Sequence, residues 1–165
     1  PYLGGLAIVI SFSLAIFFAA MTSPPVSGRD AEFHVGRADC LRQGDDVTII
    51  ACGCLVADAI AAAKLLSTEG VAVRVLNMHT IKPLDCDAVL TAAAETKGIV
   101  TAEEHRITGG LGGAVAELLA RKNPTAMRMV GMPDEFATVG PTGKVREGYG
   151  LSSANIITSC LELLA

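Results

Sequence analysis

The order of apolar and polar positions divides most of the chain into alternating strands and helices. The run VTIIAC at 47–52 is continuously apolar and rich in β-branched residues, which is typical of a strand buried on both faces. Apolar residues with helical spacing between Leu55 and Thr68 predict a helix, and Gly70 is placed to end it. The pattern predicts strands at 47–52, 71–78, 98–104 and 125–132, and helices at 55–68, 86–97, 111–122, from 142 and from 153 to about 164.

Strands that alternate with helices of this length predict an α/β fold. We expect a three-layer α/β/α sandwich with a mainly parallel sheet, in which Asp85, Thr142 and Ser152 cap helices. Residues 32–44 are expected to be irregular, with a strand-like FHVG. Sites in such sheets lie at the carboxyl ends of strands. The positions there are Gly53-Cys54, Met78-His79, Glu103 to His105, and Gly131 to Asp134.

The first residues differ from the rest. Residues 1–28 contain no charged side chain, and 3–21 are nearly all apolar and long enough to span a bilayer. Four alternatives are open for this segment: it is buried against the domain or a second copy, it is artificially added or erroneous, it is a membrane anchor, or it is a signal remnant. Membrane contact through 3–21 is not the favoured one. We therefore expect an apolar N-terminal segment of unknown origin at 1–28 and a domain at 32–165.

Charge and cysteine usage restrict the function classes. The net charge is −4 and the 13 Lys and Arg residues are scattered, so no basic face for nucleic acid is predicted. Five cysteines form no C-x-x-C pair. An odd number without a framework indicates reduced thiols, and hence a cytoplasmic setting.

A glycine-rich turn, Gly109, Gly110, Gly112 and Gly113, precedes the helix at 111–122. Backbone amides that converge at a helix start can bind an anion, so this turn could cradle a phosphate. The favoured interpretation is a tight turn with close packing of helix on sheet. No Gly-Lys-Ser/Thr follows, so the turn is not a P-loop.

Glu103, Glu104 and His105 cluster at a predicted strand end. Two carboxylates beside an imidazole could perform acid–base chemistry. We favour the alternative that one glutamate caps nearby backbone amides and the others contact a partner chain. Cys54, near a helix start, could have a lowered thiol pKa, but a buried, unreactive cysteine is the preferred interpretation. No metal site is predicted.

Several segments together resemble the C-terminal domain of transketolases, which are thiamine diphosphate enzymes. The resemblance covers about 32–165 and includes the transketolase-like tail at Tyr149. It is carried by GDDVTIIACG, HTIKPLD, IVTAEEHRITGGLGGAVAELLA, GMPDEFATVGPT and VREGYGLSSANII. The C-terminal half of a split transketolase fits especially well, whereas deoxyxylulose-phosphate synthase and the 2-oxoacid dehydrogenase E1 β subunit are related alternatives.

The resemblance implies a domain that assembles an enzyme without performing its chemistry. In the parent enzyme, a transferase that moves a two-carbon ketol unit between sugar phosphates, thiamine diphosphate and Mg²⁺ lie between other domains. We therefore expect no catalytic residue and no bound cofactor in this chain, which is expected to be inactive alone. The expected partner is a second copy, as a homodimer, or a complementary transketolase subunit.

The residues carried over are interface or anion-binding loop positions. They are Glu103, Glu104, His105, Gly109, Gly110 and Gly112. The rival hypothesis is a stand-alone module whose glycine turn binds an anionic ligand such as a nucleotide.

Overall fold

The computed structural model describes residues 33–165, which form one unit. The apolar segment predicted at 1–28, and with it the membrane contact through 3–21, lies outside the described residues. Among the helices of residues 33–165, none combines the length and hydropathy that a bilayer crossing requires.

Five strands form one sheet in the order β1-β3-β2-β4-β5. The three central strands and β5 run parallel, and only β1, at the edge, is antiparallel to its neighbour β3. The bounds are β1 Asp39–Arg42, β2 Val47–Ala51, β3 Val73–Asn77, β4 Ile99–Arg106 and β5 Met127–Met132.

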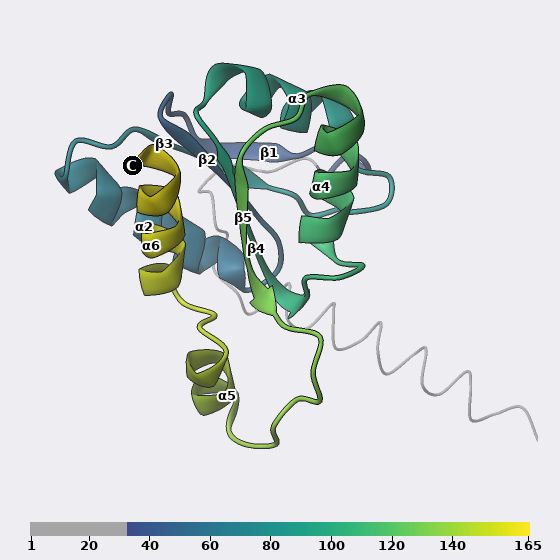
Figure 1. Cartoon of the computed structure of the whole chain (residues 1–165), viewed down its shortest axis with the longest axis vertical. Helices are drawn as coiled ribbons and strands as arrows, with labels where there is room; N and C mark the ends of the chain where they lie inside the picture. Colours follow the sequence, from purple (N-terminus) through teal and green to yellow (C-terminus); the bar gives the residue numbers. More distant parts are fainter. Residues whose placement is uncertain (1–32) are drawn as a thin grey trace, which may run out of the picture. The chain divides into compact units, whose positions relative to one another are not determined.

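Helices cover both faces of the sheet, as Figure 1 shows, so the predicted three-layer α/β/α sandwich with a mainly parallel sheet is confirmed. Helices α2 and α6 pack on one face, and α3 and α4 on the other. The short helix α5 follows a long connection beyond the end of β5 (Figure 1). The bounds are α2 Leu55–Thr68, α3 Cys86–Glu95, α4 Leu111–Lys122, α5 Thr142–Gly148 and α6 Ser153–Leu164.

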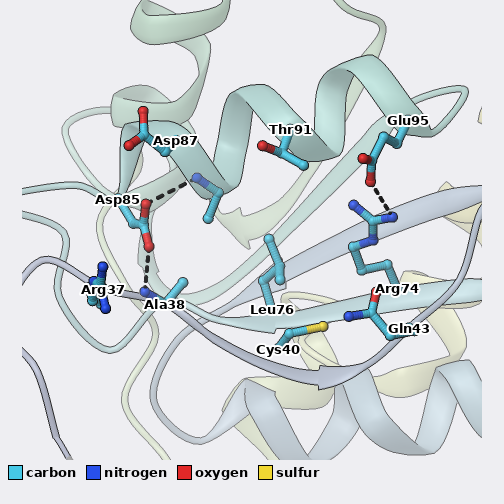
Figure 2. Close-up of a pocket in the computed structure, with 11 residues that line it drawn as sticks. Arg37, Ala38, Cys40, Gln43, Arg74, Leu76, Asp85, Asp87, Thr91 and Glu95 are labelled. Carbon is cyan, nitrogen blue, oxygen red and sulfur yellow. Dashed lines mark hydrogen bonds and ion pairs between the residues drawn. The ribbon is translucent and has the colours of Figure 1, made fainter.

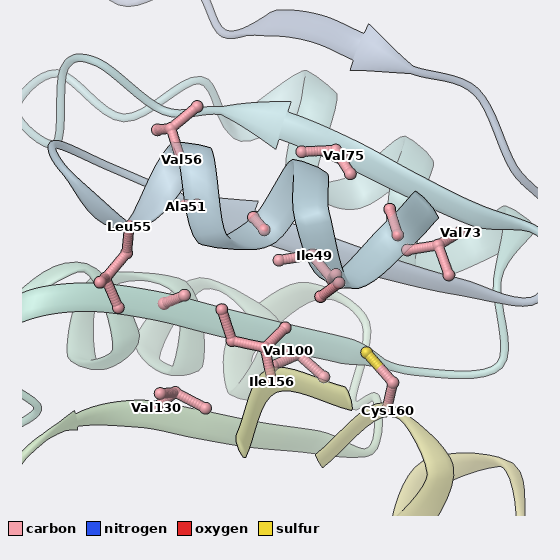
Figure 3. Close-up of a cluster of buried hydrophobic side chains, with 14 of the residues drawn as sticks. Ile49, Ala51, Leu55, Val56, Val73, Val75, Val100, Val130, Ile156 and Cys160 are labelled. Atoms are coloured by element: carbon pink, nitrogen blue, oxygen red, sulfur yellow. The ribbon is translucent and has the colours of Figure 1, made fainter. Parts of the chain in front are cut away.

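Each face of the sheet has its own apolar core. On the α2 and α6 side, alternate strand residues such as Ile49, Val75 and Val100 belong to one cluster with buried residues of α2 and of α6 (Figure 3). The opposite core contains the neighbouring strand positions together with residues of α3 and α4. Every residue of β2 is buried, which explains its continuous apolar run.

The predicted elements need three corrections. A fifth strand, β1, was missed, and the FHVG stretch expected to be strand-like is instead a turn before it. Because β1 is a short edge strand of mixed polarity, its pairing with β3 determines it rather than its own pattern. Helix α5 is preceded by Pro141, so Thr142 is its first residue and makes no side-chain cap.

Candidate functional site

Glu103 lies at the carboxyl end of β4 and points into the protein. Its carboxylate accepts hydrogen bonds from the backbone amides of Leu111 (2.7 Å) and Gly112 (2.8 Å), the first two residues of α4. The residue is only 1% exposed. Since the N-cap residue Gly110 has no side chain, Glu103 caps α4 from the neighbouring strand. This geometry agrees with the prediction that one glutamate caps nearby backbone amides.

Three glycines provide the space that this carboxylate occupies. A Cβ atom at Gly110 would overlap Oε2 of Glu103 and lie 2.5 Å from the carbonyl oxygen of Arg106. At Gly112 a Cβ would lie 3.3 Å from Oε1, and at Gly131 it would lie 3.2 Å from Cγ of the same glutamate. The glycine turn is therefore fitted around an internal anion.

The predicted loop residues thus divide into two groups. Glu103, Gly110 and Gly112 are buried, whereas Glu104, His105 and Gly109 are exposed. Gly109 has φ +81°, a conformation that glycine adopts without strain. An external phosphate at the first amides of α4 would have to displace a buried carboxylate.

Glu104 joins a polar cluster at the same edge of the sheet. The Cys54 thiol donates a hydrogen bond to Oε2 of Glu104 at 2.5 Å. Arg146 of α5 lies 3.9 Å from Oε1 of Glu104 and pairs with Asp58 of α2 at 2.6 Å. The cluster links the tip of β4 to helices α2 and α5.

Cys54 is exposed, so the expectation of a buried cysteine is wrong. Partial burial of the thiol group and its bond to the Glu104 carboxylate raise the pKa of Cys54 to about 11. This is opposite to the lowered pKa that a helix start alone can produce, because a carboxylate lies against the sulfur. All five cysteines are free thiols.

We expect alkylation of Cys54 by iodoacetamide to be slow at pH 8 and to accelerate as the pH rises toward 11. The thiolate is the reacting species, and a pKa of about 11 leaves little of it at pH 8. Replacing Glu104 with Gln removes the negative charge and should speed labelling at pH 8 about tenfold, the effect of one unit of pKa. Peptide mass spectrometry, with exposed Cys86 as the internal reference, measures the labelling rate of Cys54 in the natural and the Glu104→Gln proteins. Equal rates at pH 8 would contradict the role of the Glu104 carboxylate in raising the pKa of Cys54.

A separate pocket of about 470 Å³ lies between β1 and α3 (Figure 2). Its charges are of both signs. Arg74, largely buried, binds Glu95 at 2.7 Å, and Asp85 accepts hydrogen bonds from the amides of Ala38 (2.8 Å) and Ala88 (3.0 Å). The pocket holds charged groups of both signs that are partly paired with one another, and Nε of Arg74 has no hydrogen-bond partner among the described residues; the pocket shows no preference for one ligand charge, and we assign it no ligand.

Asp85 is the predicted cap of α3, and it also accepts a hydrogen bond from the amide of Ala38, just before β1. We expect Asp85→Ala to lower the free energy of unfolding by about 2 kcal/mol, since it removes one helix cap and a second amide hydrogen bond. Asp87, exposed in the first turn of α3, gives the matched control Asp87→Ala. Urea unfolding measures the difference, and equal losses for the two variants would contradict the double role of Asp85.

The glycine turn before α4 does not fit the diphosphate of thiamine diphosphate. A diphosphate needs free donors, and the first two amides of α4 already donate to Glu103. Within residues 33–165 no group of three or more His, Cys, Asp or Glu side chains is arranged to hold a metal ion. We therefore derive no chemistry through the cofactor in this domain.

The sequence analysis missed residues that fix the connection between β5 and α5. Arg106 pairs with Asp134 and donates to the carbonyl oxygen of Glu135 at 3.0 Å. The Tyr149 hydroxyl accepts from the amide of Thr138 at 3.0 Å. An arginine at a strand end was the only sequence signal for the first contact, and its partner is 28 residues away.

Comparison with known proteins places these features in a family. The model "Transketolase, C-terminal domain" matches residues 36–156. The 6-deoxy-6-sulfo-D-fructose transketolase subunit SqwH of Clostridium sp. (strain MSTE9) is 43% identical over 138 residues, covering 84% of this chain and 43% of that protein. One of the apulose-4-phosphate transketolase subunits of Phocaeicola vulgatus is 42% identical over 135 residues, covering 82% of this chain and 43% of that protein.

A 1-deoxy-D-xylulose-5-phosphate synthase of Heliobacterium modesticaldum is also similar, with 44% identity over 130 residues, covering 78% of this chain but 20% of that protein. The chain thus spans less than half the length of these relatives. A solved split-gene transketolase, an inactive beta4 tetramer, matches with a TM-score of 0.81 and 40% identity, over 86% of this chain and 46% of that one. The chain belongs to the transketolase C-terminal domain family, as the residues quoted for the resemblance predicted.

Proposed function

We propose that this chain acts in the assembly of a transketolase-type enzyme, contributing contacts and no catalytic residue. The observation that carries the proposal is the Glu103 cap. The glycine turn that could have bound a phosphate is fitted around a carboxylate of the protein itself. The turn then serves to hold β4 and α4 together and to fix the tip of β4, where Glu104 and His105 are exposed.

The partner is a second copy or a complementary transketolase subunit. Two similar proteins carry the word subunit in their names, and the solved relative is a tetramer. We place Glu104 and His105 at an interface, because both are exposed at the carboxyl edge of the sheet. Thiamine diphosphate and Mg²⁺ would be held by other domains of the assembled enzyme, and a cytoplasmic setting is consistent with five free thiols.

Deoxyxylulose-phosphate synthase is the second candidate for the parent enzyme. The Heliobacterium protein supports it, since its identity to this chain is as high as that of the transketolase subunits. The two parents differ in product, so an assay of ketol transfer between sugar phosphates and an assay of 1-deoxy-D-xylulose-5-phosphate formation distinguish them.

The test is reconstitution of activity. A transketolase subunit that carries the cofactor-binding domains but lacks a C-terminal domain is assayed for ketol transfer before and after addition of the full chain. We expect no transfer by this chain alone and a gain of activity on mixing. Transfer by the purified chain alone would overturn the proposal, and so would the absence of both complex formation and gain.

A further inference from the structure

Helix α5 has little apolar packing against the rest of the domain. It has seven residues, and none of them is buried. The large apolar side chains of the connection that precedes it are in solvent as well, since Phe136 is 97% exposed and Val139 is completely exposed. An isolated helix shorter than about 12 residues is marginal in water. A contact with the rest of the domain must therefore hold α5 in its helical form.

Arg146 provides this contact. Within residues 33–165 it is the side chain of α5 that bonds to another element. One of its terminal nitrogens donates to a carboxylate oxygen of Asp58 in α2 at 2.6 Å, and its Nε lies 3.9 Å from Oε1 of Glu104. The side chains of Arg146 and Asp58 are 27% and 26% exposed. Water and salt therefore weaken this pair less than they weaken a fully exposed ion pair.

Cavities lie on both sides of Arg146. One, of about 370 Å³, is lined by Arg146, Glu104 and mainly apolar residues that include Leu151. The other, of about 320 Å³, is lined by Arg146, Asp58 and polar residues that include Asn155. Because open space flanks the helix, few dispersion contacts would be lost if α5 moved away from the domain.

The chain on either side of α5 is fixed. The Tyr149 hydroxyl accepts a hydrogen bond from the amide of Thr138 at 3.0 Å, which joins the two ends of the stretch between them. The amide of Leu151, a residue only 3% exposed, donates to the carbonyl oxygen of Arg146 at 2.8 Å. We call residues 139–148 the α5 segment. It can leave the domain without disturbing the core, because its two ends are held together outside it.

We propose that the α5 segment is a releasable element, closed by the Arg146–Asp58 pair, that opens while the rest of the domain remains folded. Local opening of this kind costs less than global unfolding where few apolar contacts are lost. Opening uncovers Asp58 and Glu104 and exposes both cavities. The release therefore changes the surface at the tip of β4, and it does not depend on the proposed function.

Hydrogen exchange of the full chain, followed by peptide mass spectrometry, measures the opening. The amides of Val145 and Tyr149 report on α5, since they donate to the carbonyl oxygens of Pro141 and Val145. In the natural chain we expect them to exchange on the order of 100-fold faster than the central amides of β4. Asp58→Asn keeps the size of the side chain and removes its charge. It should speed the exchange of α5 about tenfold further.

Glu147→Gln is the matched control. Glu147 lies on α5 and lines the same cavity as Asp58, and within residues 33–165 its side chain forms no ion pair. Its replacement should leave the exchange of α5 within about twofold of the natural rate. Arg146→Gln should speed exchange at least as much as Asp58→Asn. Adding Asp58→Asn to it should have no further effect, because both changes break the same pair.

Three results would overturn the proposal. If α5 of the natural chain exchanges as slowly as β4, the α5 segment does not open by itself. If Asp58→Asn speeds the exchange of α2 and β4 as much as that of α5, the pair stabilises the whole domain. If the effects of Arg146→Gln and Asp58→Asn add, the two residues do not act through one contact. None of these results decides the proposed function, because complementation of a cofactor-binding subunit is measured separately.

Discussion

Replacing Glu103 with Ala is expected to lower the free energy of unfolding by about 4 kcal/mol, the largest effect that we predict for one side chain. The carboxylate is buried and accepts two amide hydrogen bonds, at 2.7 and 2.8 Å, from the first turn of α4. Without it, both amides lose their acceptor inside the protein, and the start of the helix loses a favourable negative charge. Urea unfolding, followed by circular dichroism, measures the loss.

The matched control is Glu117→Ala. Glu117 lies on the exposed face of the same helix, so its loss should change the free energy of unfolding by no more than about 0.5 kcal/mol. Equal stability of the Glu103→Ala and Glu117→Ala proteins would show that the cap contributes nothing. It would also remove the reason to treat the glycine turn as fitted around an internal carboxylate.

Replacing Gly110 with Ala is expected to cost about 3 kcal/mol. The added methyl group would overlap Oε2 of Glu103 and lie 2.5 Å from the carbonyl oxygen of Arg106, which is backbone and cannot rotate away. Either the carboxylate leaves the two amides or the turn shifts. Gly143→Ala is the control, because nothing lies within 4 Å of a Cβ at Gly143 in helix α5, and alanine there should be neutral or slightly stabilising.

The two changes should not be additive. Once Glu103 is alanine, the methyl group at Gly110 still meets the Arg106 carbonyl but no longer meets the carboxylate, so part of its cost disappears. We expect the double variant to be more stable than the sum of the single losses by about 1 kcal/mol or more, the coupling typical of residues in contact. Strict additivity would indicate that the two residues do not share the space that the structure gives them.

Sequence patterns predicted those elements whose own residues determine them. Helices α2 and α4 begin and end where the spacing of apolar residues and the flanking glycines predicted. Strand β2 is buried along its whole length and has a continuous apolar run. Strand β1 has no such pattern, because a four-residue edge strand is held by its partner β3. The missing information was long-range pairing.

The candidate site was predictable to a similar extent. The sequence showed a carboxylate cluster and a glycine turn, and it favoured a tight structural turn and a glutamate that caps amides over binding of an external anion. Only the direction of the Glu103 side chain, set by alternation along β4, distinguishes these possibilities. The exposure of Phe136 could not be predicted, since the backbone around it is fixed by contacts of Arg106 with Asp134 and of Tyr149 with Thr138, which join residues 28 and 11 positions apart.

Calorimetric titration of the full chain with thiamine diphosphate in the presence of Mg²⁺ distinguishes an assembly domain from a cofactor-binding one. If this domain helps to assemble a transketolase-type enzyme and leaves cofactor binding to other domains, the chain alone gives no saturable heat of binding. Saturable binding should then be observed once a subunit with the cofactor-binding domains is added. Saturable binding near one cofactor per chain, without any partner, would contradict the assembly role.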